Sequence, residues 1–76
     1  MVDMTYNGVL NWRVIMNELI EEIKDITGRE VNEKNLFKYC YTNKMPPSRL
    51  CYILMTASRL VREDYLAEFE KEGVLE

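Results

Sequence analysis

The sequence predicts an all-α protein, a small compact bundle of three to five helices that forms a single domain over residues 1–76. Apolar residues recur at steps of three and four along most of the chain, which is the spacing of amphipathic helices. Hydrophobic residues make up 47% of the sequence and charged residues 30%, a balance typical of folded and not of disordered chains. A chain of 76 residues buries only about 60 to 65% of its unfolded surface, so its core must be small.

The first expected helix covers residues 9–26. Asn7 or Asn11 can cap it, and Gly28 is expected to end it, because glycine readily adopts the positive φ that follows many helices. Its apolar face is formed by Trp12, Ile15 or Met16, Leu19, Ile23 and Ile26. The opposite face is acidic, a pattern typical of a solvated surface, and carries Glu18, Glu21, Glu22 and Asp25.

The second expected helix has Asn32 as its N-cap and runs to about Thr42. Its inner side is apolar and consists of Leu36, Tyr39 and Cys40, with Phe37 at the edge. Its outer side is polar and consists of Lys34, Asn35, Lys38 and Thr42. We therefore expect Lys34 and Lys38 to project into solvent together, one helical turn apart.

A stiff connector follows, because Pro46 and Pro47 each push the preceding residue out of the α region. Ser48 is expected to cap the third helix. The inner face of that helix is predicted to be formed by Leu50, Ile53, Leu54, Ala57, Leu60 and Val61. Its outer face is predicted to carry Arg49, Tyr52, Thr56 and Arg59.

The C-terminal segment, residues 63–72, places Tyr65, Leu66 and Phe69 on one side and is expected to end at Gly73. No proline or glycine separates it from the third helix, so it can be a separate helix or a continuation. Its apolar residues, with Val74 and Leu75, are many for so small a domain. We therefore expect an obligate or easily formed homodimer.

Charge is distributed unevenly along the chain. Residues 1–28 contain two basic and five acidic residues, a net charge of −3. Residues 29–62 contain seven basic and two acidic residues, a net +5, and residues 63–76 contain one basic and six acidic residues, a net −5. The overall charge of −3 thus includes a basic centre, and phosphate binding depends on whether that charge gathers on one face.

Cysteine and histidine usage argues against a metal or cofactor site. Cys40 and Cys51 are the two cysteines and histidine is absent, so a zinc site with nitrogen and sulfur ligands cannot form within one chain. We expect both cysteines to be small buried hydrophobes, with a disulfide between two helices as the alternative. No signal peptide or membrane-spanning segment is predicted, and the expected location is the cytoplasm.

Catalysis is not expected either. The sequence has no histidine, no serine or cysteine beside a plausible base and no glycine-rich phosphate loop. Its paired carboxylates, Glu21 with Glu22 and Glu63 with Asp64, lie in runs typical of solvated faces. A binding function is therefore expected, and no enzyme or cofactor.

The central segment combines a turn, a capped helix, an exit, a proline and a serine-capped helix. This layout covers about residues 16–61 and is formed by Gly28, Val31, Asn32, Leu36, Tyr39, Asn43-Lys44, Pro47-Ser48, Leu50, Ile53 and Ala57. It resembles the helix-turn-helix domains of phage repressors of the Cro and lambda-repressor type, in which the first capped helix is the recognition helix. Arg29 and Glu30 lengthen the turn, and Ile23 or Lys24 stands where that family has a small alanine. The resemblance implies a helix-turn-helix-like bundle.

The first functional hypothesis is a small DNA-binding transcriptional regulator. The resemblance places base-reading positions at Asn32, Lys34, Asn35 and Lys38, with Lys44 and Arg49 near phosphates of duplex DNA.

The alternative is a small protein-interaction module, for instance a phage or mobile-element inhibitor or antirepressor. It would act through the acidic helix or the aromatic tail, that is, through Glu18, Glu22, Asp25, Tyr65 and Phe69.

Overall fold

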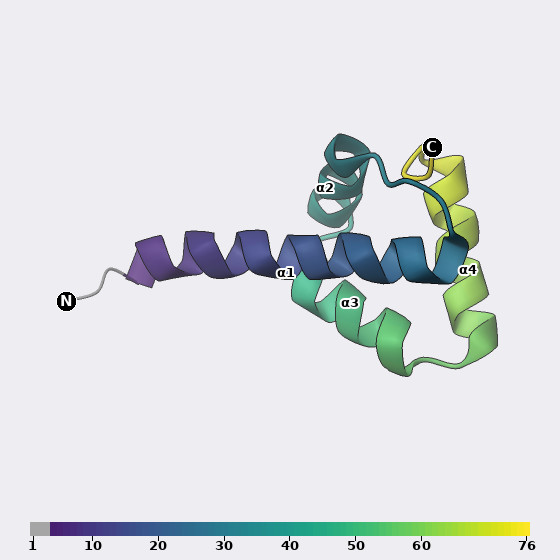
Figure 1. Ribbon diagram of the computed structural model, residues 1–76, viewed down its shortest axis with the longest axis horizontal. Coiled ribbons are helices and arrows are strands. Elements are labelled where there is room, and N and C mark those ends of the chain that lie inside the picture. The colour runs from purple at the N-terminus through teal and green to yellow at the C-terminus, as the bar shows by residue number, and fades with distance from the viewer. Residues whose placement is uncertain (1–3) are drawn as a thin grey trace.

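The computed structural model describes the backbone of residues 4–76 and the side chains of residues 13–76. It confirms a compact all-α fold, with four helices and no strand in the part described: α1 (Met4–Thr27), α2 (Glu33–Thr42), α3 (Pro47–Thr56) and α4 (Arg59–Lys71). Helix α1 is the long horizontal helix of Figure 1. Helices α2 and α3 appear on either side of its C-terminal half, and α4 crosses its C-terminal end.

One hydrophobic core joins all four helices, and α1 packs most closely against α3. The apolar spacing predicted most of the core correctly, although Trp12 lies outside the described side chains. The buried residues are Met16, Leu19 and Ile23 of α1, Leu36, Tyr39 and Cys40 of α2, Leu50, Cys51 and Leu54 of α3, Phe69 of α4, and Val74 and Leu75 after it. Both cysteines are free and buried, as expected.

Helix α1 begins earlier than expected. It starts at Met4, so Asn7 and Asn11 lie within the helix and neither caps it. Asparagine is a favoured N-cap residue, which is why a later start was expected. The predicted end is confirmed: Gly28 takes φ +69° and donates its N–H to the Lys24 carbonyl at 2.7 Å.

Helix α2 follows its prediction closely. The Asn32 side chain accepts a hydrogen bond from the Asn35 N–H at 3.0 Å, which is the expected N-cap, and the helix ends at Thr42. Lys34 and Lys38 are both exposed, as predicted. Lys44 then takes a left-handed conformation with φ +53°, which turns the chain toward α3.

The third helix differs from its prediction at both ends. It begins at Pro47, after Pro46 at the N-cap position, so Ser48 lies in its first turn and does not cap it. Proline is favourable there because the first turn of a helix has no intrahelical partner for its N–H. The helix ends at Thr56, and Ala57 is an extended C-cap with ψ 163°.

The C-terminal segment is a separate helix. The Ser58 hydroxyl accepts a hydrogen bond from the Val61 N–H at 3.5 Å and caps α4. Leu60 and Val61 therefore belong to α4 and not to the inner face of α3, and Leu60 is 74% exposed. Arg59 likewise leaves the predicted outer face of α3, and its Nε lies 3.2 Å from Glu63 Oε2.

The chain end folds back onto the start of α2. Gly73 ends α4 with φ +76°, as predicted, and an isolated bridge pairs Val31 with Leu75. The Asn32 N–H donates to the Val74 carbonyl at 2.7 Å, and Asn35 Nδ2 donates to the Gly73 carbonyl at 2.8 Å. The last residues are thus part of the core and not a loose tail.

Within residues 4–76, none of the four helices combines the length and the apolar content that a membrane span requires.

Candidate functional site

A groove of about 520 Å³ lies between α1 and α3. We call it the acidic groove. It brings together three predicted partner-binding residues, Glu18, Glu22 and Asp25, which α1 presents at steps of three and four. Its lining consists of Val14, Asn17, Glu18, Glu21, Glu22, Asp25, Cys51 and Met55.

The carboxylates of the acidic groove are largely uncompensated. Glu21 lies 3.9 Å from Lys24, whereas Glu18, Glu22 and Asp25 form no ion pair with any described residue. Their charge reaches the floor of the groove: the pKa of the Cys51 thiol is raised, first by burial and then by the nearby carboxylates of Glu22 and Glu18. The groove is therefore a region of negative potential.

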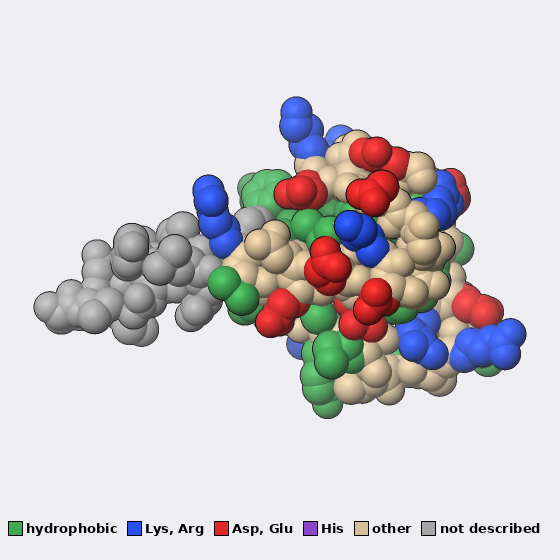
Figure 2. Space-filling model, viewed as in Figure 1, with side chains coloured by type: hydrophobic (Ala, Val, Ile, Leu, Met, Phe, Trp, Pro, Cys, Tyr) green, Lys and Arg blue, Asp and Glu red, His purple; other side chains and the backbone are tan. Residues whose placement is uncertain are grey.

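The floor of the acidic groove is apolar and partly open to solvent. Val14 of α1 is 55% exposed and Met55 of α3 is 62% exposed, and the Cys51 and Met55 sulfur atoms are 3.9 Å apart. Figure 2 shows acidic side chains gathered over α1, next to hydrophobic side chains along the edge of α3. Charged rims around exposed apolar surface are typical of interaction sites.

A second candidate surface is the outer face of α2, formed by Lys34, Phe37, Lys38 and Tyr41. Phe37 is 48% exposed and Tyr41 is 78% exposed. Their rings are stacked, with centroids 6.5 Å apart and planes 17° from parallel. None of the cations predicted to contact DNA forms an ion pair with a described residue; these cations are Lys34, Lys38, Lys44 and Arg49.

The basic centre of the sequence is only partly gathered on this face. Arg29 instead bonds to Glu70 on α4, which lowers the pKa of that carboxyl group, and its Nε donates to the Glu76 carbonyl at 3.1 Å. Arg59 pairs with Glu63. These two arginines therefore act within the chain.

The two asparagines predicted to read bases also form hydrogen bonds within the chain. Asn32 caps α2, and the Asn35 amide holds Gly73 at the chain end. The sequence indicated the capping role of Asn32, but nothing in it indicated the long-range bond of Asn35.

The aromatic tail is part of the core. Phe69 is fully buried and contacts Tyr39 edge to face at a centroid distance of 5.2 Å, while Tyr65 is half-buried. The Tyr39 hydroxyl donates to Glu68 Oε1 at 2.6 Å, and burial, followed by this bond, raises the pKa of Tyr39. Phe69 is therefore unavailable to a partner in the folded chain.

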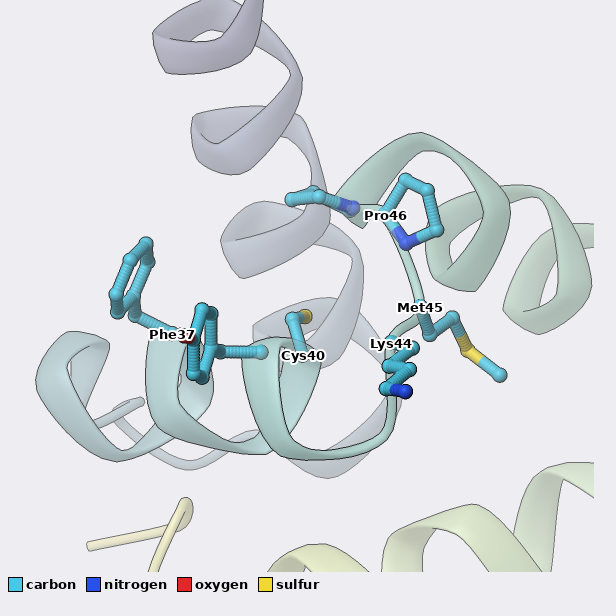
Figure 3. A pocket seen from close by; sticks show the side chains of 7 residues that line it. Phe37, Cys40, Lys44, Met45 and Pro46 are labelled. Atoms are coloured by element: carbon cyan, nitrogen blue, oxygen red, sulfur yellow. The ribbon is translucent and has the colours of Figure 1, made fainter.

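A smaller hollow of about 310 Å³ lies where α2 turns into α3 (Figure 3). Lys44 lies at this turn, and burial raises the pKa of the Cys40 thiol beside it to about 11. Nothing in the sequence indicated this hollow, because it forms where the chain turns from α2 into α3. Its lining residues are Phe37, Cys40, Tyr41, Lys44, Met45, Pro46 and Pro47.

Among the described residues, no three histidine, cysteine, aspartate or glutamate side chains lie together in a way that could hold a metal ion. Comparison with protein-family models, with curated proteins and with solved structures finds no match to this chain. The candidate functions are therefore inferred from the chain's own surfaces.

Proposed function

We propose that the protein is a small interaction module that binds a basic amphipathic segment of a partner protein in the acidic groove. The observation that supports this most directly is that the unpaired carboxylates of α1 lie beside two exposed apolar side chains, Val14 of α1 and Met55 of α3. An inhibitor or antirepressor would act in this way, by occupying a basic segment of its target.

Charge and shape complementarity together define the partner segment. Glu18, Glu22 and Asp25 attract lysine or arginine side chains, mainly by steering the encounter. Val14 and Met55 supply the apolar contact that holds the complex after docking. An amphipathic helix with one apolar and one basic face offers both features at helical spacing, and such helices commonly bind in grooves.

The probe for this function is a pair of synthetic peptides of identical composition, rich in lysine and leucine. In one peptide the leucines form a helical stripe, and in the other the order is scrambled. We expect fluorescence anisotropy to show tighter binding of the striped peptide, because only that peptide presents both faces at once. Equal binding of the two peptides would show that charge alone acts, and would contradict the proposal.

The second candidate is the binding of duplex DNA by α2, in the manner of a helix-turn-helix regulator. It is favoured by the exposure of Lys34 and Lys38 one turn apart, with Lys44 and Arg49 also exposed. It is weakened by the internal bonds of Asn35 and by the unbroken α1, which replaces the separate first helix of the repressor family.

Reciprocal charge reversals separate the two candidates. If α2 binds duplex DNA, Lys38→Glu abolishes the gel shift at low salt, and Glu22→Lys leaves it intact or slightly stronger. If the acidic groove is the functional surface, Glu22→Lys weakens peptide binding and Lys38→Glu leaves it unchanged. Lys38 is exposed, so its replacement is expected to change the free energy of unfolding by less than about 0.5 kcal/mol.

A further inference from the structure

The outer face of α2 combines two kinds of side chain within one arc of the helix. Positions 34, 37, 38 and 41 follow one another at steps of three, one and three, which places all four on the same side. All four residues are exposed. Two cations and two aromatic rings therefore lie on one exposed side of the helix.

This combination suits the faces of bases better than their edges. Base edges in a duplex groove are read mainly by side chains that make paired hydrogen bonds, such as asparagine or glutamine to adenine and arginine or lysine to guanine. The Asn35 amide, which could make such bonds to adenine, instead donates to the Gly73 carbonyl, and the Asn32 side chain caps the helix. Phe37 and Tyr41 lie beside the lysines, and aromatic rings stack on unpaired bases.

We infer that the outer face of α2 binds single-stranded nucleic acid, with bases stacked on Phe37 and Tyr41 and phosphates held by Lys34 and Lys38. The two rings are within 17° of parallel, so successive stacked bases can lie on both. Lys44, just after the end of the same helix, lines a hollow together with Phe37 and Tyr41 and supplies a third cation near the two rings. This inference is independent of the acidic groove, and it replaces duplex DNA with unpaired strands as the ligand of α2.

Charge and base stacking predict opposite preferences between duplex and single-stranded nucleic acid. A duplex carries charge at higher density than a single strand, so binding by charge alone would favour the duplex. Stacking is available only to unpaired bases, so it reverses that preference. If three lysines contact phosphates, the logarithm of the binding constant for the single strand should fall with the logarithm of the salt concentration with a slope of about −2.

The experiment uses fluorescein-labelled strands of about 12 nucleotides, a length within the usual site size of single-strand binding proteins. The strands are oligo-dT, oligo-U, a duplex of the same length, and an abasic strand that carries phosphates without bases. We expect the full chain to bind the oligo-dT or oligo-U strand at least about tenfold more tightly than the duplex or the abasic strand at the same salt concentration. The ratio of dT to U binding identifies the preferred sugar.

Tyr41→Ala is the variant that tests stacking, and Tyr52→Ala on α3 is its matched control, because Tyr52 is also well exposed at 67%. We expect Tyr41→Ala to weaken single-strand binding by about 5- to 100-fold and Tyr52→Ala to leave it unchanged. Tyr41 is 78% exposed, and a thermal melt checks that the fold is retained. Equal or tighter binding of the duplex, equal binding of the abasic strand, or no binding at low salt would each overturn the inference.

Discussion

At the residue scale, Gly73 and Gly28 carry the same backbone requirement in different surroundings. Both have positive φ, +76° and +69°. A Cβ on Gly73 would lie 3.0 Å from Asn35 Nδ2, whereas a Cβ on Gly28 would have no neighbour within 4 Å. Gly28 is therefore needed only for its backbone conformation. Gly73 is needed for its backbone conformation and also because a side chain there would have little room beside Asn35.

This difference predicts unequal costs for two alanine substitutions. Gly28→Ala is expected to lower the free energy of unfolding by about 1 kcal/mol through backbone strain. Gly73→Ala is expected to cost more, about 2 kcal/mol, because it also disturbs the bond from Asn35 to the Gly73 carbonyl. Urea titration measures both. Equal costs would show that the contact with Asn35 contributes nothing.

The pKa of the Cys51 thiol depends on the charge of the acidic groove. Glu22 and Glu18 contribute to its raised pKa, because their carboxylates disfavour the thiolate. The double variant Glu18→Gln, Glu22→Gln is therefore expected to lower this pKa. At pH 8 the thiolate fraction of Cys51 then rises, and alkylation by iodoacetamide becomes faster.

Cys40 is the internal control for this measurement. Burial alone raises its pKa to about 11, so its alkylation rate should not change in the double variant. A Cys51 rate that is also unchanged would contradict the negative potential assigned to the groove.

At the element scale, the helix ends at Gly28 and Asn32 could be predicted, and the break between α3 and α4 could not. Asn32 and Gly28 marked their helix ends correctly. The break between α3 and α4 has no proline or glycine; an extended Ala57 and the cap of Ser58 create it. The apolar stripe that runs on through Leu60 and Val61 therefore placed the end of the third helix too late.

The geometry of the two caps predicts which contributes more to stability. The Asn32 side chain accepts its bond at 3.0 Å, and the Ser58 hydroxyl accepts a longer one at 3.5 Å. Asn32→Ala is expected to cost about 1 kcal/mol and Ser58→Ala about 0.5 kcal/mol. Denaturant unfolding monitored by far-ultraviolet circular dichroism measures both, and a larger cost for Ser58→Ala would contradict this order.

The candidate sites, like the helix ends, could be predicted from the sequence only in part. Periodicity alone placed Glu18, Glu22 and Asp25 on one face of α1. It also predicted that Lys34 and Lys38 are exposed. It could not show that α3 supplies Cys51 and Met55 beside those acids, because that depends on how two distant helices pack. The internal bonds of Asn35 and Arg29 were hidden for the same reason.

At the scale of the whole molecule, the C-terminal residues complete the core. Val74 is fully buried and Leu75 is 9% exposed. Phe69 is buried as well, so much of the apolar surface that motivated the homodimer prediction is already covered within one chain. The homodimer remains a prediction, and sedimentation that gives only monomer at high micromolar concentration would contradict it.

Deletion of residues 74–76 is expected to destabilise the whole fold. It removes two buried apolar side chains, each contributing about 1.5 to 3 kcal/mol, together with the bonds to Asn32 and Glu30. A loss on the order of 3 kcal/mol is a large part of the stability of a domain this small. A thermal melt measures it, and an unchanged melting temperature would show that the chain end is dispensable.

The acidic groove is the central functional assignment, and one comparison of matched charge reversals tests it most directly. Glu22 lines the groove, and Asp64 is an exposed residue of α4, so Glu22→Lys and Asp64→Lys make the same charge change inside and outside the groove. We expect Glu22→Lys to weaken binding of the striped lysine and leucine peptide about tenfold, because an attraction becomes a repulsion, and Asp64→Lys to leave it nearly unchanged. Equal effects of the two variants would show that the peptide senses only net charge, and would contradict a specific site between α1 and α3.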